Sequence, residues 1–146
     1  MPKQPSAEET AALVDRFFEF MPIVVAHIDG RLEPADLTNT DQWALRTIDG
    51  PTPMKELAHC MGFDPSYVTV VADRLESRGL IERQPHPTDR RVKNLVLTAK
   101  GRKVRANLAD TLWSGDTVFS SLNASQRGQL ADLLDGMIAA NRSADD

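Results

Sequence analysis

Cysteine is almost absent from this chain of 146 residues, and long apolar runs are absent altogether. The single cysteine, Cys60, cannot form an intrachain disulfide, which excludes the disulfide frameworks of small secreted domains. The longest apolar runs, such as residues 23–26, are far too short to cross a bilayer. Residues 1–6 also lack the apolar stretch of a signal peptide. We therefore expect a cytoplasmic protein without a membrane partner.

The motifs that would indicate an enzyme or a metal site are missing too. The sequence contains no phosphate-binding loop, no dinucleotide-binding glycine pattern and no serine nucleophile elbow. His27, His59 and His86 fall on different predicted segments, and none has a partner at metal-ligand spacing. We therefore expect no catalysis, no cofactor and no bound metal. We interpret Cys60 as a buried structural cysteine rather than a redox sensor.

Positive charge is scarce overall but concentrated in one segment. The chain has a net charge of −4, yet residues 83–105 contain eight basic residues and one acidic residue, a local charge of +7. The rest of the chain therefore carries −11. A basic segment on an acidic body is typical of proteins that bind polyanions. On charge alone, a solvated basic face without a partner explains the pattern equally well.

Capping signals predict where the first two helices begin. Ser6 with Glu9 three residues later forms a capping-box pattern, which predicts a helix that ends at residues 29–30. Pro22 lies inside this helix and should kink or split it. A second helix begins within residues 38–41. Its spacing predicts three inward-facing apolar side chains: Trp43, Ala44 and Ile48.

Two short helices follow at helix-turn-helix spacing. Thr52 as N-cap and Pro53 as the first helical residue predict a third helix that ends at Gly62. Residues 64–65 repeat the cap-proline signal and open a fourth helix, which Gly79 ends. Because only a short turn separates the two helices, the pair fits a helix-turn-helix.

A basic β-hairpin follows the fourth helix directly. Residues 80–83 and 92–97 read as short strands, and the prolines within residues 85–89 exclude regular structure between them. Thr98 then caps a fifth helix, and Asn123 begins the last one. The predicted fold class is mainly α with a small β-hairpin (α+β), in which the hairpin forms a wing beside the helix-turn-helix.

Three runs in this region resemble the signature of the MarR family of transcriptional regulators. The first run is Leu75 to Arg83, in which a helix ends at a glycine and a strand ends at an arginine. The second run is Asp89-Arg90-Arg91. The third run lies within Leu95 to Gly101 and contains the Leu-Thr-x-x-Gly start of a helix. Each run is weak alone, but their order and spacing together are specific. The helical segments before and after also fit the family, so the resemblance covers nearly the whole chain.

The resemblance implies a domain organisation and an oligomeric state. It places a winged helix-turn-helix DNA-binding domain at residues 37–98, between dimerisation helices within residues 1–36 and 99–146. The flanking segments also contain more large apolar side chains than one small domain can bury, which favours a homodimer by itself. A two-fold dimer that binds double-stranded DNA predicts a near-palindromic operator. The family habit implies repression.

The wing residues receive roles from the same resemblance. It implies that Arg91 enters the minor groove and that Asp89 orients Arg91 through a charge-assisted pair. Arg90 and Lys93 would contact phosphates. The alternative for Asp89 and Arg91 is a surface ion pair that only stabilises the hairpin.

The fourth helix supplies the candidates for reading bases. Four residues at or near its exposed N-terminal half are candidates for base-edge and thymine-methyl contacts: Ser66, Tyr67, Thr69 and Val70. Arg74, one turn further on, is expected to meet the DNA backbone. Thr52 and Lys55, at the start of the third helix, are weaker phosphate candidates. A place in the core remains the alternative for Tyr67 and Val70.

Two further expectations concern partners. The resemblance implies a small, frequently aromatic or phenolic effector that binds between the dimer helices and the DNA-binding lobes and releases DNA. The alternative function is a winged-helix protein-interaction module without DNA binding. The charge of the wing disfavours it, because a protein-binding wing has no need of a segment that carries +7.

Overall fold

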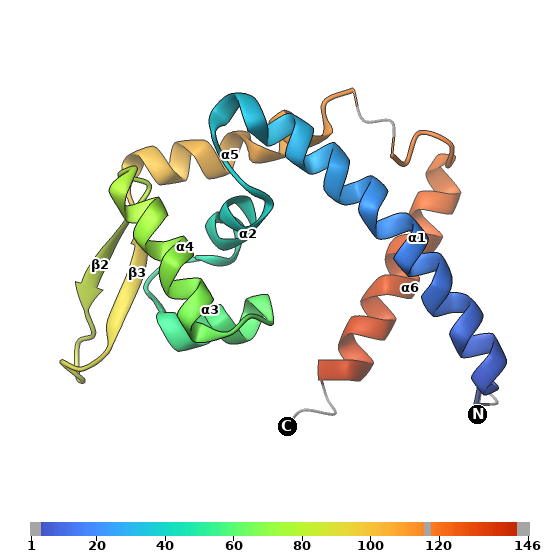
Figure 1. Cartoon of the computed structure of the whole chain (residues 1–146), viewed down its shortest axis with the longest axis horizontal. Coiled ribbons are helices and arrows are strands. Elements are labelled where there is room, and N and C mark those ends of the chain that lie inside the picture. The colour runs from blue at the N-terminus through green and yellow to red at the C-terminus, as the bar shows by residue number, and fades with distance from the viewer. Residues whose placement is uncertain (1–3, 116–117, 143–146) are drawn as a thin grey trace. The chain divides into compact units, whose positions relative to one another are not determined.

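The structure is a computed structural model that describes residues 4–115 and 118–142. The chain divides into two compact units, Met1–Ser114 and Gly115–Asp146. The first unit contains, in chain order, α1 (Ala7–Leu32), the short 3-10 helix η1 (Glu33–Ala35), α2 (Asn39–Thr47), β1 (Thr52–Pro53), α3 (Met54–Met61), α4 (Pro65–Ser77), β2 (Ile81–Pro85), β3 (Lys93–Leu97) and α5 (Ala99–Trp113) (Figure 1). The second unit contains α6 (Ala124–Arg142). The predicted mainly helical fold with a small antiparallel sheet is confirmed.

Helix α1 begins as predicted but ends later. The Glu9 backbone N–H donates to the Ser6 hydroxyl (3.1 Å), and the Ser6 N–H donates to the Glu9 carboxylate (2.7 Å). The helix continues past residues 29–30 to Leu32, which is fully buried, so packing overrides the local stop signal. The predicted split at Pro22 is wrong, because α1 is one helix through that residue. Pro22 is exposed, where water can satisfy the carbonyl that loses its partner.

Helix α2 also begins with a capping box, formed by Thr38 and Asp41. Ala44 and Ile48 are fully buried, as predicted. The inward orientation predicted for Trp43 is wrong, because 41% of this residue is exposed. Its ring instead meets Phe63 edge to face at the surface, with ring centroids 5.6 Å apart. Helical spacing alone does not separate this position from a core position, because Trp43 lies beside the buried stripe.

The sheet has three strands in the order β1-β3-β2, all antiparallel. The sequence predicted only the hairpin β2–β3. Thr52 pairs with Leu95 in β1, so its predicted role as N-cap of the third helix is wrong, and Pro53 occupies that position without a side-chain hydrogen bond. Strand β2 extends to Pro85, which pairs with Lys93. The predicted irregular segment 85–89 therefore begins one residue later, since an edge strand tolerates proline.

The predicted helix-turn-helix is confirmed in α3 and α4. Helix α3 ends at Gly62, whose φ of 65° is the left-handed conformation that glycine adopts without strain. Asp64 caps α4 by accepting from the Ser66 N–H (2.8 Å). Gly79, with a φ of 68°, turns the chain from α4 into β2.

Packing at the start of α5 explains why the Leu-Thr-x-x-Gly segment has threonine and glycine at these positions. The Thr98 hydroxyl accepts from the Gly101 N–H (3.0 Å) and donates to the Gly79 carbonyl (2.6 Å). A Cβ atom on Gly101 would lie 1.9 Å from the Leu80 carbonyl oxygen, which no side chain tolerates. Thus the glycine lets the first turn of α5 press against the backbone between α4 and β2.

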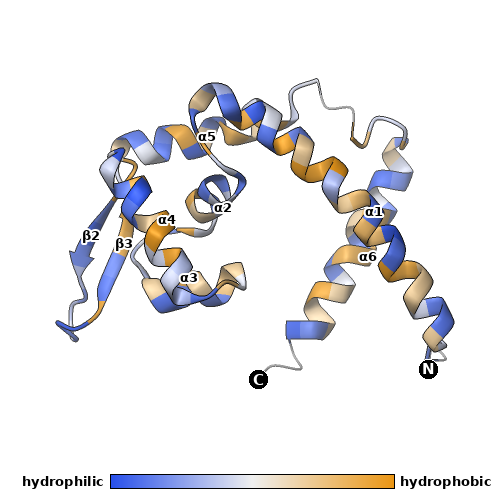
Figure 2. Ribbon diagram, viewed as in Figure 1, coloured by the Kyte–Doolittle hydropathy of each residue, from blue (hydrophilic) through white to orange (hydrophobic). Residues whose placement is uncertain are grey.

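The first unit has one apolar core, to which α2, α3, α4, the sheet, α5 and the C-terminal end of α1 all contribute. Its largest fully buried apolar side chains are Leu32, Leu45, Ile48, Leu57, Leu75, Leu80, Ile81, Leu95, Leu112, Val68 and Val71. By contrast, α6 has no buried residue, and Figure 2 shows apolar positions along much of α1 and α6. Over the described residues, no helix is long and apolar enough to cross a membrane.

Candidate nucleic-acid interface

The four base-reading candidates lie on one exposed stretch at the start of α4. Ser66, Tyr67, Thr69 and Val70 are all exposed, whereas Val68 and Val71 are buried. Val70 is 59% exposed and Tyr67 is 46% exposed, so the alternative that placed them in the core is wrong. More than half of Val70 is therefore accessible from outside the chain.

Local contacts fix the orientation of three of these side chains. The Ser66 hydroxyl donates to the Asp64 carboxylate (2.5 Å), and the Thr69 hydroxyl donates to the Pro65 carbonyl (2.9 Å). Both hydroxyl oxygens therefore present acceptor lone pairs outward. The Tyr67 ring meets Phe63 edge to face, with centroids 5.3 Å apart. The hydroxyl and then the backbone N–H of Ser66 lower the pKa of Asp64 below its ordinary value of 3.8.

The tip of the wing carries three exposed basic residues, Arg90, Arg91 and Lys93. The Asp89 carboxylate accepts a hydrogen bond from the backbone N–H of Arg91 (2.9 Å). In the part of the chain that the structure describes, the Asp89 carboxylate forms no ion pair with the Arg91 guanidinium, so the predicted charge-assisted pair and its alternative, a surface ion pair, are both wrong. The reason is local, because a carboxylate two residues before an N–H closes a tight turn. Asp89 thus shapes the wing tip, and the Arg91 guanidinium has no hydrogen bond within the described residues.

Arg83 connects the wing to α4. From β2, its guanidinium forms ion pairs with Asp73 (2.5 Å) and with Glu76, both on α4. Burial would lower the pKa of Arg83, but the hydrogen bond and charge of Asp73 and the charge of Glu76 outweigh burial and raise it. Arg83 thus braces the wing against α4, and its guanidinium is engaged within the fold.

Several basic residues of the segment 83–105 are engaged within the fold. Lys100 donates to the Arg78 carbonyl (2.9 Å), Arg102 to the Leu97 carbonyl (2.8 Å), and Arg105 to the Ile48 carbonyl (2.7 Å). Together with Arg83, these residues hold α5 and the sheet to the rest of the first unit. The local charge of +7 is therefore not one binding patch, and the basic side chains open to a partner concentrate at the wing tip.

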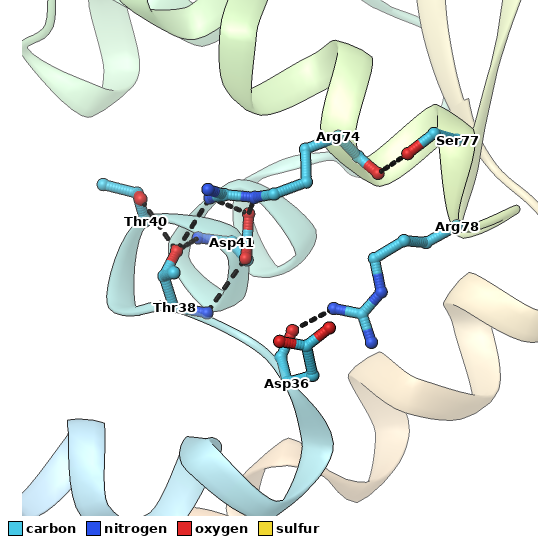
Figure 3. Close-up of polar contacts among 7 residues, drawn as sticks. All are labelled: Asp36, Thr38, Thr40, Asp41, Arg74, Ser77 and Arg78. Atoms are coloured by element: carbon cyan, nitrogen blue, oxygen red, sulfur yellow. Dashed lines mark hydrogen bonds and ion pairs between the residues drawn. The ribbon is translucent and has the colours of Figure 1, made fainter.

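The remaining candidates differ in accessibility. Lys55 is exposed in the first turn of α3. Thr52 is only 7% exposed, and its hydroxyl donates to the Gly50 carbonyl (3.2 Å), which leaves little of it for a phosphate. Arg74 points away from the wing toward α2, where it meets Asp41 (2.5 Å) and Thr38 (2.9 Å) (Figure 3). No sequence motif indicated these contacts, because 33 residues separate Asp41 from Arg74.

The prediction that Cys60 is buried is wrong, because its side chain is exposed. Helix α3 buries Leu57, Ala58 and Met61, and Cys60 lies outside that stripe. The helical phase of these three residues could have indicated the exposure. Among the described residues, no group of three or more histidine, cysteine, aspartate or glutamate side chains is placed to hold a metal ion.

A cavity in the first unit lies along α2 and α5. Its volume is about 550 Å³, within the range of small-molecule pockets. The walls combine apolar side chains with two arginines and one carboxylate: Leu108, Ala109, Leu112, Trp113, Arg46, Arg105 and Asp49. The lining therefore offers both apolar and charged groups to the same volume.

Comparisons with known proteins agree with this geometry. Residues 37–93 match the model of the MarR family. A mutant of MarR from E. coli, crystallised with operator DNA, is 22% identical and covers 92% of this chain and 99% of its own, with a TM-score of 0.78. The transcriptional regulator BldR from Sulfolobus solfataricus is 23% identical and covers 94% and 99%, with a TM-score of 0.81. A MarR transcriptional regulator from Methanosarcina mazei Go1 is 20% identical and covers 92% and 99%, also at 0.81.

Proposed function

We propose that this chain, in which residues 37–93 match the model of the MarR family, is a sequence-specific DNA-binding transcriptional regulator. One observation carries the proposal. The exposed, locally oriented start of α4 is tied through Arg83 to a wing whose basic tip is open to a partner. A helix that presents side chains beside a cationic hairpin can enter the major groove while the hairpin follows the phosphates.

The proposed contacts follow from the side chains that are accessible. Helix α4 is about 20 Å long, which suits the major groove. Ser66 and Thr69 can accept hydrogen bonds from base amino groups, and the exposed faces of Tyr67 and Val70 suit thymine methyl groups. Arg91 would enter the adjacent minor groove, where a narrow groove attracts cations. The proposed phosphate contacts come from exposed cations: Arg90, Lys93 and Lys55.

We also propose that the protein acts as a homodimer. Six large apolar residues of α1 are exposed: Leu13, Val14, Phe17, Phe18, Met21 and Ile23. Three of α6 are exposed as well: Leu133, Met137 and Ile138. A second copy would cover these faces, which gives the segments 1–36 and 99–146 the role of dimerisation and 37–98 the role of DNA binding. Two α4 helices about 34–36 Å apart would then read a near-palindromic operator.

Repression and release by a small molecule complete the proposal. A regulator that occupies an operator blocks transcription until its DNA-binding geometry changes. The cavity along α2 and α5 supports an aromatic or phenolic effector, because Trp113 offers a ring surface and Arg46 a cation to the same volume.

Fluorescence anisotropy tests the proposal. A labelled duplex from the region upstream of the gene is compared with a scrambled duplex over a salt series. The Arg91→Ala variant is compared with Lys103→Ala, which removes the same charge from an exposed position of α5. We expect tighter binding to the upstream duplex, a steep salt dependence of about 0.9 per phosphate contact, and a loss of affinity only for Arg91→Ala.

Two other results would count against the proposal. Equal effects of Arg91→Ala and Lys103→Ala would mean that the wing binds through diffuse charge and does not read DNA. If no duplex, including those selected from a random library, binds at low salt, the DNA-binding function fails. The protein-interaction module would then be the better account of the fold.

A further inference from the structure

Two arginines on the C-terminal part of α4 hold the segment that joins α1 to α2. The Arg74 guanidinium donates to one Asp41 oxygen through Nε (3.0 Å) and Nη2 (2.5 Å), and Nη2 also donates to the Thr38 hydroxyl (2.9 Å). Arg78, the C-cap of α4, donates to the backbone carbonyls of Ala35 (2.9 Å) and Asp36. Figure 3 shows both side chains extended from α4 toward this segment. Each is therefore directed at the α1–α2 junction.

Burial of the Asp41 carboxylate makes the loss of its ion pair with Arg74 energetically costly. Its side chain is 1% exposed, and its second oxygen accepts from the Thr38 N–H (2.9 Å). A buried carboxylate that loses its cation is costly, because no water replaces the lost interactions. The capping box of α2 thus serves a second purpose, since the same two residues bind α4.

Arg74 lies directly behind the residues that face the groove. Tyr67, Val70 and Arg74 follow one another at i, i+3 and i+7, so they share one side of α4. Any rotation of α4 that moved Arg74 away from Asp41 would turn Tyr67 and Val70 as well. The exposed part of Arg74, 41% of its side chain, leaves a phosphate contact sterically open, so the two roles need an experimental distinction.

We propose that Arg74 is a positioning residue, which fixes the rotation of α4 through Asp41 and Thr38, and that it does not contact the DNA backbone. Arg78, one turn further along at the C-cap of the same helix, is held to the Ala35 and Asp36 carbonyls at the end of η1. The α1–α2 junction then determines how the start of α4 enters the groove. The inference rests on the proposed DNA-binding function and replaces the phosphate contact expected for Arg74.

The test compares Arg74→Gln, Asp41→Asn and the double variant with the native protein. Each is titrated with a duplex selected by the native protein from a random library and with its scrambled counterpart, over a salt series. For a positioning role, we expect both single variants to lose affinity for the selected duplex by about tenfold, the size of one misplaced base contact. The double variant should lose no more than either single one. Binding to the scrambled duplex should stay within about twofold, because those contacts are made by phosphates and not by bases.

The salt dependence separates the two roles. A positioning role leaves the slope of log K against log salt unchanged in Arg74→Gln, whereas a lost phosphate contact lowers it by about 0.9. Arg90→Gln, at an exposed position of the wing, is the control expected to show that lower slope. Asp41→Asn is equally informative, because a side chain that is 1% exposed cannot touch DNA.

A conservative variant keeps the test decisive if removal of either charge prevents folding. Arg74→Lys retains the positive charge but cannot reach Asp41 and Thr38 in the same forked manner. We expect the preference of Arg74→Lys for the selected duplex to fall about tenfold, and full retention of affinity and preference would overturn the positioning role. So would a lower slope in Arg74→Gln. A native protein that prefers no duplex would instead overturn the proposed function, and this inference with it.

Discussion

The winged-helix segment buries most of its large apolar side chains, whereas much of α1 and α6 leaves its large apolar side chains exposed. Between Leu37 and Leu97, the helices and strands direct most of their large apolar side chains into one core. Helix α1 leaves Phe18 73% exposed, and α6 leaves Leu133 67% exposed. An isolated helix of this kind gains little from its own hydrogen bonds. The difference teaches that the winged helix is stabilised by contacts within the chain, whereas α1 and α6 keep exposed apolar side chains that the proposed dimer would bury.

The largest loss of operator affinity is expected when a mutation introduces a charge into the proposed dimer surface. Phe18→Asp places a carboxylate on the exposed apolar face of α1. Loss of the dimer would remove the simultaneous binding of two half-sites, so operator affinity should fall by about 10²–10⁴. Sedimentation equilibrium and anisotropy measure the two effects. Glu19→Gln, on an exposed polar position of the same helix, should change neither. A Phe18→Asp variant that stays dimeric would contradict the assignment of the exposed apolar face of α1 to the dimer surface.

A matched pair of truncations tests the same comparison by stability. Leu75→Ala in α4 removes a fully buried side chain and should lower the free energy of unfolding by about 2–5 kcal/mol. Urea unfolding should show this loss equally at low and high protein concentration. Leu133→Ala in α6 should act mainly through association, so its effect should depend on protein concentration. If the effects of Leu75→Ala and Leu133→Ala depended on protein concentration in the same way, the distinction between a core side chain and a dimer side chain would be contradicted.

Glycine substitutions should have opposite signs in the two regions. Gly101→Ala forces a Cβ to within 1.9 Å of the Leu80 carbonyl oxygen, and we expect destabilisation by about 1–3 kcal/mol, seen as a lower Tm. A Cβ on Gly128 in α6 meets nothing within 4 Å. Gly128→Ala should therefore stabilise its helix by up to about 1 kcal/mol through the higher helix propensity of alanine. Calorimetry of both variants measures the difference. A neutral Gly101→Ala would mean that α5 is less closely packed on this backbone.

The smallest effect concerns the cap of α4. Ser66 lowers the pKa of the Asp64 carboxyl, so ionised Asp64 contributes stability that is present above its ordinary pKa of 3.8 and is lost as the pH falls through the lower folded value. Asp64→Asn keeps a good capping side chain without the titration. The difference in urea midpoint between the two proteins should be constant at neutral pH and should shrink below pH 3.8. A difference that does not change with pH would contradict this role.

Local signals predicted the starts of most helices. The capping residues Ser6, Asp64, Thr98 and Asn123 each bind a backbone N–H within three residues, so the sequence alone contains both partners. The four exposed candidates on α4 also follow from its helical phase, since Val68, Val71 and Leu75 form the buried stripe. The same reasoning about phase, applied to α3, would have placed Cys60 outside the core.

Other features of the site were beyond the reach of local patterns. Strand β1 has only two residues, and it becomes a strand because β3 lies beside it. Asp89 and Arg91 carry the charges of an ion pair, but the turn uses the carboxylate for a backbone N–H. The arginines of the basic segment differ in their contacts. Arg83 pairs with Asp73, whereas Arg91 is exposed, and this difference depends on the surroundings of each side chain in the fold.

The sequence by itself determined the order of the α-helices, most of their caps, the hairpin of the wing and the buried stripe of α4. These depend on residues within a turn or two of one another, where chain geometry leaves few alternatives. Only the tertiary structure decided that Arg74 forms an ion pair with Asp41, that Arg83 joins the wing to α4, and that Trp43 lies at the surface. Those outcomes depend on segments far apart in the chain, whose approach is set by the packing of the whole core and not by any local preference.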